Sequence, residues 1–181
     1  RLNNNQRINL ARLSHDWSVG SKASLLDAGL TSWNLSDKID SGGYVRYLIP
    51  SELEAQGIRL KRKIPMNEQV CYKYLVNVDG HTAPNRTSWI LNSGCLMLLV
   101  ESLYQDRTWT DNNLRAWKHY VPIKADLSDL EDQILWCRDH DAECRRIVRD
   151  AKTFALTYFN RATISEYMAY MLNRMASNAH K

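Results

Sequence analysis

The sequence predicts an α/β fold in which a parallel sheet is flanked by helices. The run at 73–78 is aromatic and β-branched and breaks at Gly80, which indicates a strand that ends in a tight turn. A short helix is predicted at 87–94, with Gly94 in the position of a C-terminal cap, and the wholly apolar run at 95–100 indicates a buried strand. A strand, a helix and a strand in this order form a β-α-β unit, from which parallel sheets are built.

The segments before this unit are less regular. Residues 6–14 favour a helix, and residues 25–29 favour a short strand. Residues 31–57 are polar and irregular, with a possible short helix at 50–53. Apolar and basic residues alternate at 58–64, which indicates either an exposed strand or a basic patch; we favour a solvated face.

The segments after the unit are mostly helical. We expect a loop and short helix at 101–117 and a further strand at 117–123. Acidic residues and serine at 126–131 favour a helix start, and we expect the helix to continue through 136. Apolar residues at helical spacing predict two more helices, at 141–158 and 163–176.

Composition fits one soluble domain. The chain has 181 residues, of which 44% are hydrophobic and 24% are charged. We expect an irregular N-terminal part at 1–64, core β-α-β units at 65–138 and C-terminal helices at 139–181. The net charge of +4 suits a nucleotide or another polyanion without requiring one. No apolar run approaches the roughly 20 residues of a membrane span, and no signal peptide opens the chain.

The cysteines and glycosylation sequons bear on the compartment. Cys71, Cys95, Cys137 and Cys144 form no C-x-x-C pair and have no histidine at metal-ligand spacing, so buried thiols are favoured over disulfides or zinc. The second of two N-glycosylation sequons, at 85–87, lies where a glycan would obstruct the expected ligand turn. This favours a cytoplasmic setting, with the secretory lumen possible if the full chain has a signal.

The turn after the first strand of the unit is the candidate binding site. In open parallel sheets, ligands bind at the carboxyl ends of the strands, where a helix N-terminus favours anions. Arg86 would add a permanent charge and a two-pronged contact, which predicts a phosphate-bearing ligand. The pattern contains neither G-x-G-x-x-G nor Gly-Lys-Ser/Thr, which disfavours ordinary dinucleotide binding and P-loop hydrolysis. A structural turn with an exposed arginine remains the alternative.

Asp27 is a second candidate. At the carboxyl end of its predicted strand it could accept hydrogen bonds from ligand hydroxyls, and its alternative is a helix-cap or turn residue.

Two long motifs carry a family resemblance. The run KYLVNVDG at 73–80 with an arginine six residues later, and the run WKHYVPIKADLSDL at 117–130, together resemble glycosyltransferase family 90. That family includes protein O-glucosyltransferases, fungal capsule-associated xylosyltransferases and lipopolysaccharide-type and large-DNA-virus relatives. The resemblance spans nearly the whole chain, and details at 66–69 and 99–102 are closer to the microbial and viral branch.

The resemblance implies a GT-B enzyme with two Rossmann-like domains, which inverts the anomeric carbon of a UDP-sugar without a metal or other cofactor. The chain is similar to the C-terminal, donor-binding domain, so it is expected to bind donor rather than turn it over alone. The family's Phe-Arg-Gly motif would lie upstream of residue 1. The catalytic base would lie in the N-terminal domain, so no catalytic residue is expected in this chain.

The resemblance also assigns binding roles by position. Arg7 and Arg86 match arginines that contact the diphosphate, and Asp27 matches an acidic position near the donor sugar. The turn that faces the nucleotide and the end of the next strand complete the expected donor site: Gly80, His81, Thr82, Ala83 and Glu101. Pro84 departs from the family pattern and removes one N–H group from the anion site.

Three functions follow from these observations. The first is transfer of a hexose or pentose, glucose or xylose, from a UDP-sugar to a hydroxyl of a protein or glycan acceptor. The second is a non-catalytic nucleotide-sugar-binding module. The third, nucleic-acid binding, is disfavoured because the basic residues at 59–63 are not interleaved with aromatics.

Overall fold

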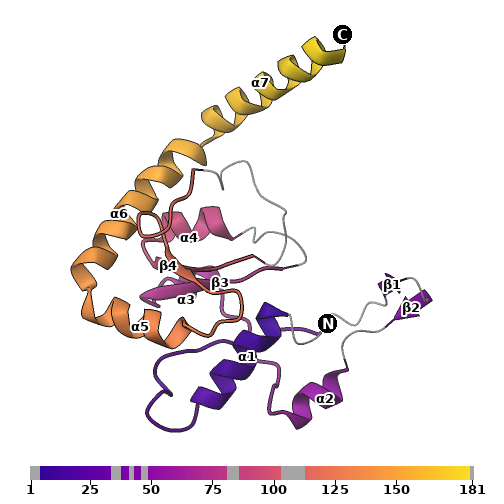
Figure 1. Cartoon of the computed structure of the whole chain (residues 1–181), viewed down its shortest axis with the longest axis vertical. Coiled ribbons are helices and arrows are strands. Elements are labelled where there is room, and N and C mark those ends of the chain that lie inside the picture. The colour runs from indigo at the N-terminus through magenta and orange to yellow at the C-terminus, as the bar shows by residue number, and fades with distance from the viewer. Residues whose placement is uncertain are drawn as a thin grey trace.

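The computed structural model describes residues 5–33, 38–40, 43–45, 49–80, 86–102 and 113–179. Helices and strands alternate through the middle of the chain, and helices follow at its C-terminal side (Figure 1). In chain order the elements are α1 (Gln6–Trp17), β1 (Lys38–Asp40), β2 (Gly43–Val45), α2 (Pro50–Ala55), α3 (Met66–Gln69), β3 (Tyr74–Asn77), α4 (Thr87–Ser93), β4 (Leu96–Val100), β5 (Val121–Ile123), α5 (Leu130–Asp139), α6 (Asp141–Tyr158) and α7 (Arg161–Ala179).

The central sheet confirms the predicted β-α-β unit. Strands β3, β4 and β5 lie in that order and both pairings are parallel, with Val76 opposite Leu98 and Leu98 opposite Val121. Helix α4 forms the connection from β3 to β4 and ends at Gly94, whose φ of 86° is the left-handed conformation predicted for its cap. A separate antiparallel pair, β1 with β2, was not predicted.

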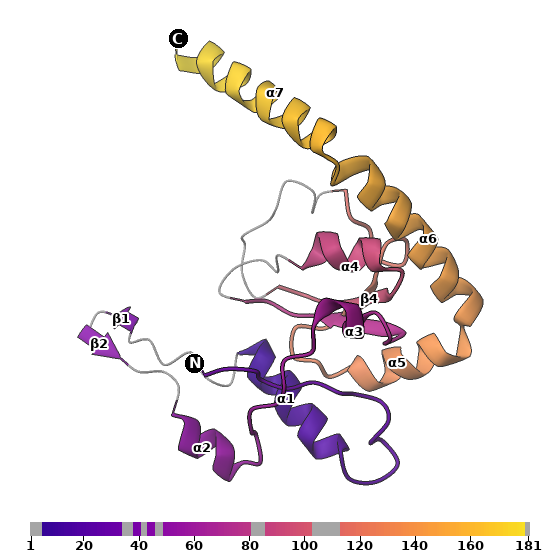
Figure 2. The same cartoon turned by 180° about the vertical axis from the view of Figure 1, so that it is seen from behind.

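Helices cover both faces of this sheet. Alternate residues of β4 enter two different apolar clusters, as the period of two in a strand requires. Leu96, Leu98 and Val100 pack with residues of α1 and α5, whereas Met97 packs with residues of α4 and α6. Figures 1 and 2 show α1 and α4 on opposite sides of the strands. This burial on both faces explains why the strand is apolar throughout.

Helix α1 lies between the sheet and a third apolar cluster. Leu10 and Trp17 face the sheet cluster, while Ile8 and Ala11 pack with Leu53 of α2 and its neighbours. At the other end of the chain, α7 projects away from the sheet (Figures 1 and 2) and leaves apolar side chains exposed. Among the described helices, none has the length and apolar character needed to span a bilayer.

The predicted strand at 25–29 is wrong. The Ser14 hydroxyl donates to the Leu26 carbonyl (3.2 Å) and accepts from the Ala28 N–H (2.9 Å). One side chain of α1 therefore takes up backbone groups that a neighbouring strand would otherwise need. Leu30 and Leu60 form an isolated parallel bridge, and 58–64 forms no regular strand.

The predicted strand at 117–123 is shorter than expected. Trp117 has a φ of 63°, and its N–H donates to the Tyr120 carbonyl at 2.8 Å. This turn delays the strand until Val121. The helix expected within 101–117 falls mostly on residues outside the described part; 113–117 contain no helix.

Gln6 joins the carboxyl ends of all three strands. Its amide N–H group donates to the carbonyls of Glu101 (2.7 Å) and Ala125 (3.3 Å), and its amide oxygen accepts from the Asp79 N–H (3.0 Å). These three groups follow β4, β5 and β3 respectively. Gln6 is only 3% exposed, so water cannot easily replace these bonds.

We predict that Gln6→Leu lowers the free energy of unfolding by about 1–3 kcal/mol, because it strands buried backbone groups without removing volume. Gln56→Ala is the matched control, since Gln56 is exposed and its side chain accepts a hydrogen bond from the exposed end of the Arg12 side chain at 2.9 Å. Urea unfolding of both variants measures the difference. Equal free energies of unfolding for the two variants would show that the hydrogen bonds of Gln6 make no net contribution to stability.

Candidate functional site

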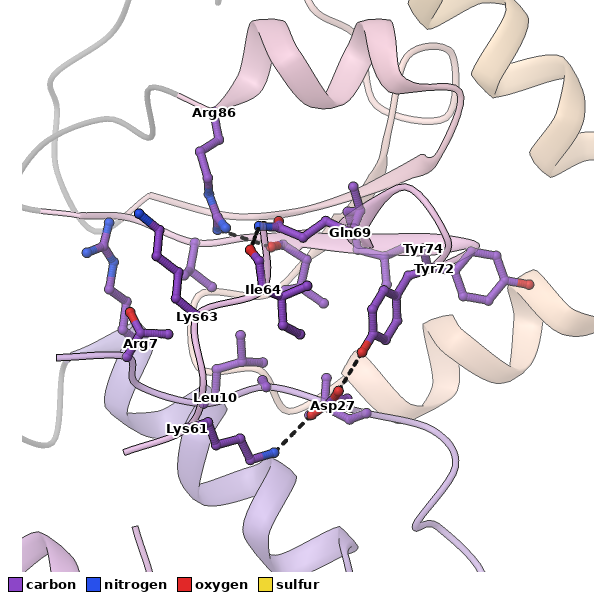
Figure 3. Close-up of a pocket in the computed structure, with 18 of the residues that line it drawn as sticks. Arg7, Leu10, Asp27, Lys61, Lys63, Ile64, Gln69, Tyr72, Tyr74 and Arg86 are labelled. Atoms are coloured by element: carbon purple, nitrogen blue, oxygen red, sulfur yellow. Dashed lines mark hydrogen bonds and ion pairs between the residues drawn. The ribbon is translucent and has the colours of Figure 1, made fainter. Parts of the chain in front are cut away.

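A cleft of about 1210 Å³ lies beside β3, an edge strand of the sheet among the described residues. Its walls are β3, the N-terminal half of α1, the loop at 24–32 and the segment at 61–66 (Figure 3). Seven basic residues line it: Arg7, Lys61, Arg62, Lys63, Lys73, Arg86 and Arg138. Asp27 is the one carboxylate among the described lining residues, so the cleft is strongly cationic.

The structure brings Arg7 and Arg86 to this cleft from opposite sides of β3. Arg7 extends from the first turn of α1, and its Nε donates to the Asp79 carbonyl at 3.1 Å. Arg86 immediately precedes α4, and its guanidinium donates to the Val76 carbonyl at 3.4 Å. Both arginines therefore rest on main-chain oxygens at one end of β3, which places them by the backbone of the sheet.

Neither arginine has a carboxylate partner within the part of the chain that the structure describes. Desolvation and then the positive charge of Arg7 lower the pKa of Arg86, which nevertheless stays charged at neutral pH. Each guanidinium has five N–H donors and uses one of them on a described carbonyl. Two like charges with spare donors in one cleft favour an anion between them.

Asp27 lies at the other end of the same cleft (Figure 3). Lys61 donates to one carboxylate oxygen at 2.9 Å, and the Tyr72 hydroxyl donates to the other at 2.5 Å. These hydrogen bonds, with that of Tyr72 the stronger cause, lower the pKa of Asp27 below its ordinary value. The carboxylate is therefore ionised at neutral pH and held in one orientation, with lone pairs left for a hydroxyl donor.

Of the other predicted site residues, the two that the structure describes, Gly80 and Glu101, do not line this cleft. Gly80 follows β3, and Glu101 follows β4, where its main chain bonds Ile123 and Gln6 and its side chain is exposed. His81, Thr82 and Ala83 fall outside the described residues, as does Pro84. The expected cradle of backbone N–H groups in that turn stays a prediction.

Sequence reasoning missed residues that hold the site together. Asn77 is fully buried, and its amide donates to the Thr87 hydroxyl at 3.1 Å, which ties the end of β3 to the start of α4 beside Arg86. Tyr72 orients Asp27 from a position 45 residues away. A polar residue within an apolar strand was a readable signal for Asn77; no local pattern pointed to Tyr72.

The long motif at 117–130 lies away from the cleft and supports the core. His119 is 6% exposed, accepts a hydrogen bond from the Arg115 N–H at 3.1 Å and packs against Phe154. Burial, with the charge of Lys118 second, lowers the pKa of His119, so its neutral form is favoured. His119 therefore stabilises the turn before β5, and it does not line the cleft.

We predict that Tyr72→Phe raises the carboxyl pKa of Asp27 towards its ordinary value, measured by NMR titration. Because folding lowers the pKa of Asp27, the ionised carboxylate stabilises the folded state. This contribution to the free energy of unfolding is fully present above the unfolded-state pKa of about 3.9. It is lost as the pH falls through the folded pKa. The stability difference between parent and variant should therefore be larger at neutral pH than in acid.

Tyr170→Phe is the control for this titration, because the Tyr170 hydroxyl bonds Arg174 on α7. An Asp27 pKa that is the same in both variants would contradict the role of Tyr72.

The fold and the cleft define an α/β domain with a cationic cleft at the edge of its described parallel sheet. Its sequence matches Glycosyl transferase family 90 over residues 3–180, and the chain belongs to this family. It is 37% identical over 174 residues to uncharacterized protein 035R of Invertebrate iridescent virus 3, which covers 96% of this chain. It is 33% identical over 105 residues, 58% of this chain, to protein O-glucosyltransferase 2 of Danio rerio.

A third relative is also a viral protein. Uncharacterized protein 179R of Invertebrate iridescent virus 6 is 35% identical over 177 residues, 94% of this chain. The chain spans 15% of the length of each of these two viral relatives and 21% of the length of the Danio rerio protein. The similarity to viral proteins agrees with the viral or microbial branch expected from the sequence.

Proposed function

We propose that this chain binds the UDP-sugar donor of a glycosyltransferase that transfers a hexose or pentose to a hydroxyl of a protein or glycan. The observation that carries the proposal is that Arg7 and Arg86 both bond main-chain carbonyls at one end of β3 and line one cleft without a carboxylate partner among the described residues. Glucose is the favoured sugar because the Danio rerio relative is named a protein O-glucosyltransferase. Xylose remains the second candidate.

The chemistry of transfer explains why cations are needed there. As the bond between sugar and phosphate breaks, the departing UDP gains negative charge, and fixed cations stabilise that charge more than they stabilise the ground state. Two guanidinium groups held by backbone carbonyls are preorganised for this role. In the proposed mechanism they act in place of a metal, and the anomeric carbon is inverted.

Asp27 suits the sugar end of such a donor. Its ionised carboxylate lies across the cleft from the arginines and is held by Lys61 and Tyr72. It would accept hydrogen bonds from sugar hydroxyls. A base that takes the proton from the acceptor hydroxyl would come from a facing domain of a GT-B arrangement, with this chain as the donor-binding half.

A non-catalytic nucleotide-sugar-binding module uses the same cleft and is the second candidate. It is distinguished by turnover: a full-length protein that binds UDP-glucose but releases no UDP in the presence of acceptor would fit this second function. Nucleic-acid binding is disfavoured, because two cations of the basic run, Lys61 and Arg62, are already paired with carboxylates.

We predict that the chain binds UDP, and UDP-sugars with similar affinity, without a divalent metal. Isothermal titration calorimetry with and without a chelator tests this, and the dissociation constant should be the same in both. The reason is that the arginines supply the positive charge. Loss of binding on chelation would overturn the metal-free mechanism.

We predict that Arg86→Ala weakens UDP binding by about 1.5–3 kcal/mol, the range for hydrogen bonds to charged groups. Arg86→Lys should cost less but still weaken binding, because an ammonium keeps the charge and loses the planar fork. Arg62→Ala is the matched control. Arg62 is ion-paired with Glu68 at 2.6 Å and solvated, so its loss should change affinity within about twofold.

Uridine, which has no phosphate, should bind weakly and respond little to any of these changes. Thermal unfolding should show Arg86→Ala close to the parent in stability, since the one hydrogen bond described for the guanidinium, to the Val76 carbonyl, is long at 3.4 Å. If Arg86→Ala unfolds the domain while UDP affinity per folded molecule stays the same, Arg86 is structural and the anion site lies elsewhere.

A further inference from the structure

The basic run Lys61, Arg62 and Lys63 divides into paired and unpaired cations. Lys61 is ion-paired with Asp27 at 2.9 Å, and Arg62 with Glu68 at 2.6 Å. Lys63 has no carboxylate partner within the described part of the chain, although it lines the cleft. The sequence favoured a solvated face for this whole run, but its three members meet different surroundings.

The backbone on both sides of Lys63 is anchored. On one side, two residues before Lys63, the Lys61 N–H donates to the Leu30 carbonyl at 2.8 Å. On the other side, the Ile64 carbonyl accepts a hydrogen bond from the Gln69 amide at 2.7 Å. The anchored chain directs the Lys63 side chain towards the end of the cleft that Arg7 and Arg86 occupy, whereas Lys61 points towards Asp27 (Figure 3).

We propose that Lys63 is a third cation for the diphosphate of the donor, acting with Arg7 and Arg86 as a ligand-binding residue. This inference rests on the proposed function. Three cations from three separate segments converge on one end of a cleft whose described carboxylate, Asp27, is at the other end and already paired. The diphosphate of a UDP-sugar carries two negative charges, which two arginines balance, and a further negative charge develops on UDP as the bond to the sugar breaks. A third cation balances that developing charge.

The Lys63 contact differs in kind from those of the arginines. A guanidinium fork fixes the orientation of an oxygen pair, whereas an ammonium on a flexible stem acts as a point charge that can follow the ligand. Lys63 therefore contributes attraction more than orientation, and its effect should fade as salt screens the cleft. It should also grow with the number of phosphates on the ligand.

The test is calorimetric titration of the chain with UDP, UMP and uridine at low and high salt. Lys63→Gln should weaken UDP binding about three- to tenfold at low salt, UMP binding less, and uridine binding not at all. Lys63→Arg should keep the affinity within about twofold, because it keeps the charge. Arg62→Gln is the matched control, one residue away and paired with Glu68, and should behave like the parent.

The outcomes separate this inference from the proposed function. If the parent chain does not bind UDP, the proposed function fails. If the parent binds UDP and Arg86→Lys weakens it, but Lys63→Gln matches Arg62→Gln, Lys63 is a solvated cation and this inference alone is wrong. Thermal unfolding of both glutamine variants should match the parent; a loss of stability confined to Lys63→Gln, with unchanged affinity per folded molecule, would also overturn it.

Discussion

The buried amide of Gln6 is the interaction on which the rest of the structure depends. Parallel strands need long connections, so their carboxyl ends are held together by what lies at that edge rather than by tight turns. Here one side chain, from the first turn of α1, satisfies main-chain groups after β3, β4 and β5. The same bonds dock α1 on the sheet, and α1 in turn forms one wall of the cleft.

Periodicity was enough to predict the elements that bury a regular face. The apolar run of β4 and the helical spacing of α6 are local signals, and the structure confirms both elements, with α6 at Asp141–Tyr158. The strand expected at 25–29 failed because a distant hydroxyl, that of Ser14, competes for its backbone groups. The hydrophobic pattern of a segment does not indicate which hydrogen bonds it will make with a distant segment.

The site residues likewise divide into those with a local sequence signal and those placed by contacts between distant segments. Arg86 was predicted from its place after a strand and before a helix. Asp27 was predicted from its place at the end of an expected strand, although that strand is absent, and the role of Arg7 came from the family resemblance. The structure brings these three residues to one cleft. Lys61 and Tyr72 around Asp27 could not be predicted, because their roles come from hydrogen bonds that span 34 and 45 residues. The fold decides which charged residues lie together in the cleft. The sequence gives their number but not their positions in space.

Gln6 and Arg7 are neighbours on α1, about 100° apart around its axis. Gln6 is held by main-chain groups, so the position of Arg7 depends little on which apolar side chains fill the core below. Apolar residues of the sheet can be exchanged for others of similar volume during evolution while the backbone, and with it the guanidinium, stays in place. Such an arrangement permits extensive sequence drift among relatives at little cost to the geometry of the cleft.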